Sequence, residues 1–93
     1  MIISDNPNIE EQIVELRVMV ACNYGPSGEP DFYFCKVRCR RAEYNMGDHY
    51  SVAERKAEDE GYGGKMVSFD EHDIAGKAIL DHFEWDSAST FSV

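Results

Sequence analysis

Apolar and polar residues alternate along residues 12–22, which is the pattern of a strand with one buried face. Residues 23–30 contain two prolines and two glycines, so the chain is expected to reverse there and form a hairpin with a second strand over residues 32–41. The first strand is predicted to place Val14, Leu16, Val18, Val20 and Cys22 on the core face, and Ile13, Glu15, Arg17, Met19 and Ala21 on the other.

The second strand is predicted to have two different faces. Its core face carries Tyr33, Cys35, Val37 and Cys39, and its solvent face carries Phe32, Phe34, Lys36, Arg38 and Arg40. A two-stranded hairpin is marginally stable alone, so its apolar face needs a cover.

Helical segments are expected to supply that cover. Apolar residues at helical spacing predict a helix over residues 48–60, with Gly61 as its stop. Ser51 and Glu54 have capping-box spacing, and Asp48 is a second candidate cap. The apolar positions are Tyr50, Ala53 and Ala57.

A short strand over residues 65–69 and a second helix are predicted next. The helix is predicted to have one apolar stripe, although Gly76 inside it lowers helix stability by about 1 kcal/mol relative to alanine. Residues 87–93 are predicted to add an edge strand or to fray. The stripe consists of Ile74, Ala75, Ala78, Ile79, His82 and Phe83.

These elements predict a single α+β domain over residues 1–93, in which an antiparallel hairpin or small antiparallel sheet packs against one or two helices. Residues 1–9 and 87–93 are its candidate flexible ends. There is no long apolar run and no basic-then-apolar start, so a soluble protein without a membrane span or secretory signal is expected. An odd number of cysteines favours a reducing cytoplasm, with Cys22, Cys35 and Cys39 as buried thiols.

Candidate chemistry is sparse. Residues 70–73 set three carboxylates around His72, which fits an acid/base or metal site in a cleft, but acidic residues also complement a helix N-terminus. The glycines before Lys65 lack phosphate-loop spacing, and the histidines and cysteines lack zinc spacing. We therefore expect no enzyme activity, no cofactor and no metal.

Charge is the most informative feature left. Lys36, Arg38, Arg40 and Arg41 fall within six positions, three of them beside Phe32 and Phe34 on one strand face. Such a face can bind nucleic acid or an acidic surface. Alternatively, Glu15 lies across the ladder from Arg38 or Arg40 and neutralises part of it, or the basic residues protect an edge strand.

Acidity dominates elsewhere, with 18 Asp and Glu against 9 Lys and Arg and a net charge of -9. The first helix carries the candidate binding residues Glu54, Glu58 and Asp59. This field repels duplex DNA, but carboxylates can occupy Lys/Arg grooves that are prepared for phosphate. The acidity can also serve solubility alone.

The length, the strand-plus-helix plan, the net charge and the basic strand at residues 35–41 together resemble the small acidic anti-CRISPR proteins of phages. The resemblance implies a stoichiometric inhibitor in an infected bacterial cytoplasm that binds Cas subunits of a guide-loaded surveillance complex and blocks target DNA. Either the acidic helices occupy DNA-binding surfaces, or the basic strand reaches the guide RNA. The alternatives are an interaction module, dimeric through an edge strand carrying Phe32 and Phe34, and a small enzyme or metal protein around His72.

Overall fold

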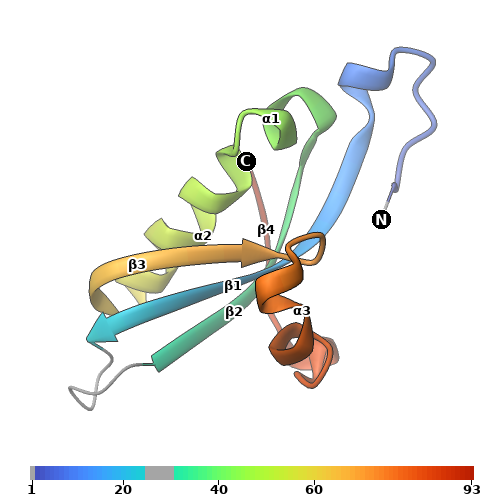
Figure 1. Ribbon diagram of the computed structural model, residues 1–93. Helices are drawn as coiled ribbons and strands as arrows, with labels where there is room; N and C mark the ends of the chain where they lie inside the picture. The colour runs from blue at the N-terminus through green and yellow to red at the C-terminus, as the bar shows by residue number, and fades with distance from the viewer. Residues whose placement is uncertain (1, 25–30) are drawn as a thin grey trace.

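The computed structural model describes residues 2–24 and 31–93 (Figure 1). In this part of the chain a four-stranded mixed sheet has the order β3-β1-β2-β4. The strands are β1 (Ile13–Tyr24), β2 (Asp31–Arg40), β3 (Gly63–Asp70) and β4 (Thr90–Ser92), and the helices are α1 (Arg41–Asn45), α2 (Asp48–Asp59) and α3 (Ile74–Leu80), with single 3-10 turns η1 (Ile9–Glu11) and η2 (Trp85–Ser87).

The α+β class and the β1–β2 hairpin are confirmed. β1 is antiparallel to both β2 and β3, whereas β4 runs parallel to β2 at the opposite edge, so the sheet is mixed rather than wholly antiparallel. β4 confirms the edge-strand alternative for the C-terminal segment. Of the predicted turn between the first two strands, residues 25–30 lie outside the described residues.

One face of the sheet packs against α2, and the predicted core of the hairpin is confirmed there. Val18 pairs with Cys35 and Leu16 with Val37, and all four side chains are buried. The helix contributes small residues, so it can lie close to the strands. The α2 residues in this core are Val52, Ala53 and Ala57.

The ends of α2 explain its length. The helix begins after Gly47, whose φ is 80°, and it stops before Gly61, whose φ is 98°. Both conformations are left-handed and suit glycine. Ser51 lies inside the helix, so the predicted capping box is wrong; instead, the Glu54 carboxylate accepts a hydrogen bond from the Ser68 hydroxyl at 2.5 Å.

The other face of the sheet has a second, smaller core that the sequence pattern did not predict. Met19, assigned to the solvent face, is only 1% exposed. Residues 74–80 form α3 over this face, and the predicted stripe is wrong because Ile74 is 91% exposed while Gly76 and Leu80 are buried. A Cβ at Gly76 would lie 2.7 Å from the Phe69 Cβ, so only glycine allows this approach.

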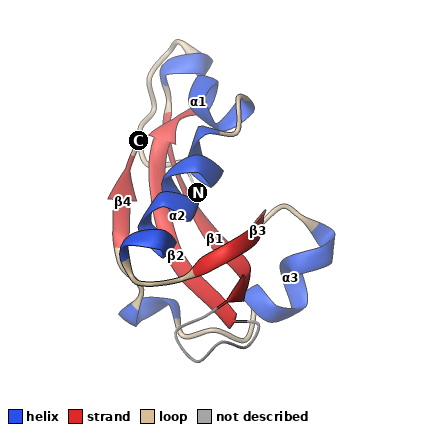
Figure 2. Cartoon of the chain, turned by 90° about the vertical axis from the view of Figure 1, so that its left-hand side faces the viewer, coloured by secondary structure: helices blue, strands red, loops and turns tan. Residues whose placement is uncertain are grey.

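The helices therefore lie on opposite faces, because neighbouring strand residues point to opposite sides. Figure 2 shows α2 along β1 and β2, and α3 beyond the end of β3, away from α2. At the N-terminus, Ile2 bridges to Val14 and the Ile3 N–H donates to the Ile13 carbonyl at 2.9 Å. No helix within residues 2–24 and 31–93 is long and apolar enough to cross a membrane.

Candidate functional site

The basic row is the face of β2 that carries Lys36, Arg38 and Arg40. Its two predicted aromatic partners differ. Phe32 is 42% exposed, but Phe34 stacks on Phe83 with ring centroids 4.0 Å apart and is half-buried. The placement of Phe34 on an open binding face is wrong, because the segment after α3 folds back over it and Trp85 meets its edge.

Arg38 is paired inside the molecule. It lies directly opposite Glu15 in the β1–β2 register, and its Nε donates to Glu15 Oε1 at 2.8 Å. This confirms the alternative in which part of the basic row is neutralised across the ladder. Arg17, on the same face of β1, lies 3.6 Å from Asp81 and 5.6 Å from the centre of the Trp85 ring.

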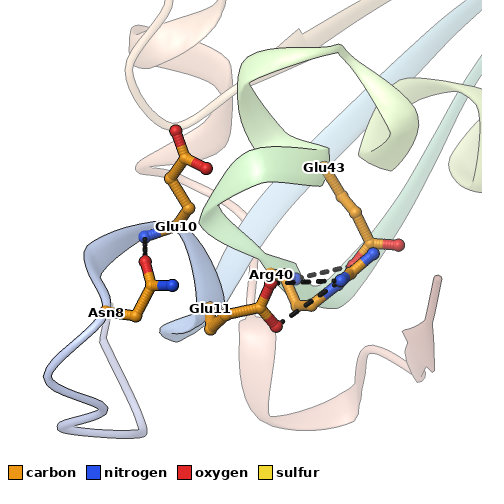
Figure 3. Close-up of polar contacts among 5 residues, drawn as sticks. All are labelled: Asn8, Glu10, Glu11, Arg40 and Glu43. Atoms are coloured by element: carbon orange, nitrogen blue, oxygen red, sulfur yellow. Dashed lines mark hydrogen bonds and ion pairs between the residues drawn. The ribbon is translucent and has the colours of Figure 1, made fainter.

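Arg40 is also paired (Figure 3). Its backbone N–H donates to Glu43 Oε1 at 2.8 Å, its Nε donates to the same oxygen at 3.2 Å, and its Nη1 reaches Glu11 Oε1 at 3.4 Å. The backbone bond lowers the pKa of Glu43, and the Glu43 and Glu11 carboxylates raise the pKa of Arg40. The Asn8 side chain accepts from the Glu10 N–H at 3.1 Å and caps the turn that carries Glu11.

The four basic residues are not one patch. Arg41 is the first residue of α1 rather than the last of the second strand, so it does not share the face of Arg38 and Arg40. Lys36 is half-buried and has no ion pair with the described residues. The structure therefore brings three predicted basic residues together, and one of them, Lys36, has no carboxylate partner within residues 2–24 and 31–93.

The α2 acidic surface comprises Glu54, Glu58, Asp59 and Glu60. The last three are exposed, and none of the four forms an ion pair with any residue in the described ranges. α2 packs on the sheet face opposite the basic row, so the sheet separates the two predicted groups of binding residues. Glu60 was not among the predicted residues, although it continues the acidic run at residues 58–60.

The acidic surface lies at the end of α2 where negative charge is least favourable. The C-terminus of a helix carries partial negative charge, and carboxylates four residues apart repel each other, as Glu54 and Glu58 do. Only Lys56 places positive charge in the last turn. Two of these carboxylates also act on Tyr33 of β2. Burial raises the pKa of Tyr33 to about 12, and the charges of Cys35, Glu60 and Asp59 contribute to that rise.

A buried polar cluster joins the start of α2 to the end of β3. His49 and Asp70 are 1% and 3% exposed, and His49 Nε2 lies 2.9 Å from Asp70 Oδ2. The Tyr50 hydroxyl donates to Asp70 at 3.1 Å and to Asp73 at 2.6 Å. Asp70 and Asp73 were predicted at a helix N-terminus, but His49 was missed. Its i, i+4 spacing with Ala53 and Ala57 indicates a buried position.

Hydrogen bonds hold this cluster in a fixed arrangement. Asp73 Oδ2 also accepts from the Asp70 N–H at 2.8 Å. Burial by itself raises the pKa of Asp73, but the bonds from Tyr50 and Asp70, with the charges of His49 and His72, bring it below its ordinary value. His72 is exposed, and its backbone N–H donates to Asp70 Oδ1 at 2.8 Å. The cluster thus ties β3 to α2 and α3.

The three cysteines are buried and free, which confirms their prediction as core thiols. Burial raises the pKa of Cys35 to about 12, so this thiol is poorly suited to nucleophilic or ligand chemistry. Within residues 2–24 and 31–93, His, Cys, Asp and Glu side chains form no group of three that could hold a metal ion.

The arrangement is therefore one of charged surfaces around a closed core. Comparison of the chain with protein-family models, with curated proteins and with solved structures finds no match.

Proposed function

We propose that this protein is a stoichiometric inhibitor that binds a guide-loaded Cas surveillance complex through the α2 acidic surface and blocks target DNA. The partner surface is rich in Lys and Arg and normally holds phosphates. Binding follows from charge complementarity, with the carboxylates of α2 occupying phosphate positions. The protein acts without catalysis, and it does not bind free duplex DNA.

The position of the carboxylates carries this proposal. Glu58 and Asp59 lie at the C-terminal end of α2, where they oppose the helix dipole, and they have no ion-pair partner among the described residues. The stability of the helix therefore does not explain why carboxylates occupy these two positions. Residues that break a local rule without structural compensation are expected at functional sites.

The basic row supports the rival mechanism, contact with guide RNA, less well. Arg38 and Arg40 are committed to Glu15, Glu11 and Glu43, so a phosphate would have to displace a carboxylate that is already in place. Phe34 is covered by Phe83 and is not free to stack on a base. Of the two mechanisms implied by the resemblance, we therefore choose the acidic one.

The test is an order-of-addition gel-shift assay at fixed salt. The protein is added to guide-loaded Cas complexes of several types either before or after the target duplex. The proposal expects loss of duplex binding only when the protein comes first, saturating near one protein per complex. If the protein associates with none of the complexes, the inhibitor proposal is wrong.

The alternative is an interaction module that dimerises through a strand edge. β4 pairs with β2 only at Lys36, Val37 and Arg38, so the part of β2 that carries Phe32 and Phe34 has no β4 partner. The outer strands of the described sheet are β4 and β3, and β3 offers the longer edge. Exposed Phe32 and Val67 lie on the same sheet face near this edge. A mass measurement in solution separates the two: the inhibitor proposal requires no dimer, and the module predicts one.

A further inference from the structure

A cavity of about 260 Å³ lies where the N-terminal segment, β1 and α1 meet. Its walls are mostly apolar, but two of its lining residues carry basic groups. The cavity is on the α2 side of the sheet, away from the basic row, and it does not include the α2 acidic surface. The lining residues are Ile2, Val14, Leu16, Arg41, Tyr44 and His72.

Arg41 differs from the arginines of the basic row. Arg38 and Arg40 each hold a carboxylate, whereas the Arg41 side chain has no hydrogen bond or ion pair with the described residues. Its Nε atom is shielded from solvent and has no hydrogen-bond acceptor in the described part of the chain. A buried donor on a charged group without an acceptor is costly, so this guanidinium is suited to receive an anion.

The carboxylates on either side of His72 in the chain have other hydrogen-bond partners, and none of them forms an ion pair with Arg41. Asp70 is bonded to His49 and Tyr50, and Asp73 accepts from the Tyr50 hydroxyl and the Asp70 N–H. Glu71 accepts from the backbone N–H of Arg17 at 2.9 Å. The His72 ring, which meets the edge of Tyr44 with centroids 6.0 Å apart, adds a second group that can face an anion.

We propose that this cavity binds a small organic carboxylate, with the carboxylate at Arg41 and the apolar body against Val14, Leu16 and Ile2. A cavity of about 150 Å³ lined by apolar residues is enough for benzene. The space here therefore suits one ring or a short alkyl chain together with a carboxylate. Inorganic phosphate would satisfy Arg41 but leave the apolar walls without a partner.

The first test uses the unmodified protein and a matched pair of probes. Benzoate and benzamide have similar shapes, but only benzoate is charged at pH 7. Both are titrated while backbone amide shifts are followed by NMR. The proposal expects shifts at Val14, Tyr44 and His72, with benzoate binding about tenfold or more tighter than benzamide. Equal affinities, shifts elsewhere, or phosphate binding as tightly as benzoate would overturn it.

The second test asks whether Arg41 supplies the charge. Arg41→Met keeps an unbranched apolar stem and removes the guanidinium. Arg55→Met is the matched control because Arg55 is exposed on α2 and has no ion pair with described residues. Arg41→Met should weaken benzoate about tenfold or more and leave benzamide within about twofold. Unchanged benzoate binding in folded Arg41→Met, or an equal loss in Arg55→Met, contradicts the assignment. If Arg41→Met does not fold, the probe pair on the unmodified protein still decides.

Discussion

The two faces of the sheet handle charge in opposite ways. On the face that carries the basic row, arginines are joined to carboxylates of β1, η1 and α1, so the charges support the fold. On the α2 face the strands meet an apolar helix surface, and the carboxylates on the outside of that helix are unpaired in the described part of the chain. The number of charged residues is therefore a weak indicator of function. Charged residues that no local contact explains are a better one.

The largest expected effect concerns packing and tests whether both faces hold a core. Met19 and Val18 are adjacent and almost fully buried on opposite sides of β1. Met19→Ala should lower the free energy of unfolding by about 2–5 kcal/mol, as in other cores. Val18→Ala is the reference on the α2 face. Urea unfolding measures both, and a cost below about 1 kcal/mol at Met19 would mean that α3 does not cover this face.

The next effect comes from the polar cluster, where Asp73 joins the two helices. Asp73→Asn keeps an acceptor but removes the charge, and it should cost about 1–2 kcal/mol at pH 7. The pKa of Asp73 is below its usual 3.8 in the folded state, so this stabilisation is full well above pH 3.8 and is lost as the pH falls through the lower folded pKa. Urea unfolding at several pH values should therefore show the gap between the two proteins narrowing as the pH falls below 3.8; a constant gap would contradict the assignment.

A smaller effect, of opposite sign, tests the α2 acidic surface. Glu58→Gln removes a carboxylate that opposes the helix dipole and repels Glu54, so it should stabilise the protein by about 0.3–1 kcal/mol at low salt and by less at high salt. Thermal unfolding at two salt concentrations measures this. Destabilisation would show that Glu58 has a stabilising partner, and the argument for its functional role would fail.

The smallest expected effect is at the basic row. Arg38→Gln breaks an exposed ion pair with Glu15 and should cost at most about 1 kcal/mol, decreasing with salt. The same unfolding experiment reports it. A stabilising substitution would mean that Arg38 is strained rather than satisfied, and the contrast between the two faces would disappear.

Much of the fold could be predicted from the sequence because strand alternation and helix spacing are local signals. The hairpin and the helix after Gly47 follow from them. The second core could not be predicted, because it depends on the close packing of α3 on β3, where Gly76 meets Phe69. In the sequence alone, Gly76 only weakens a predicted helix. In the folded chain, its lack of a side chain allows α3 to pack on β3.

The candidate site could also be predicted only in part, because local patterns indicate some of its contacts and not others. The pairing of Glu15 with a basic residue followed from hairpin register, and the acidic run followed from composition. The covering of Phe34 by Phe83 and the isolation of Arg41 on α1 depend on contacts between distant segments. Such contacts have no signature in residue spacing.

The most direct test of the central claim compares three variants in binding to a Cas complex that the gel assay identifies. Glu58→Lys with Asp59→Lys alters the α2 acidic surface, and Glu84→Lys with Asp86→Lys makes the same change in net charge at exposed residues after α3. Arg38→Gln with Arg40→Gln removes both arginines of the basic row. We expect the first variant to lose about tenfold or more in affinity and the other two to stay within about threefold. Equal losses in the two lysine variants, or a larger loss from the arginine variant, would contradict the account.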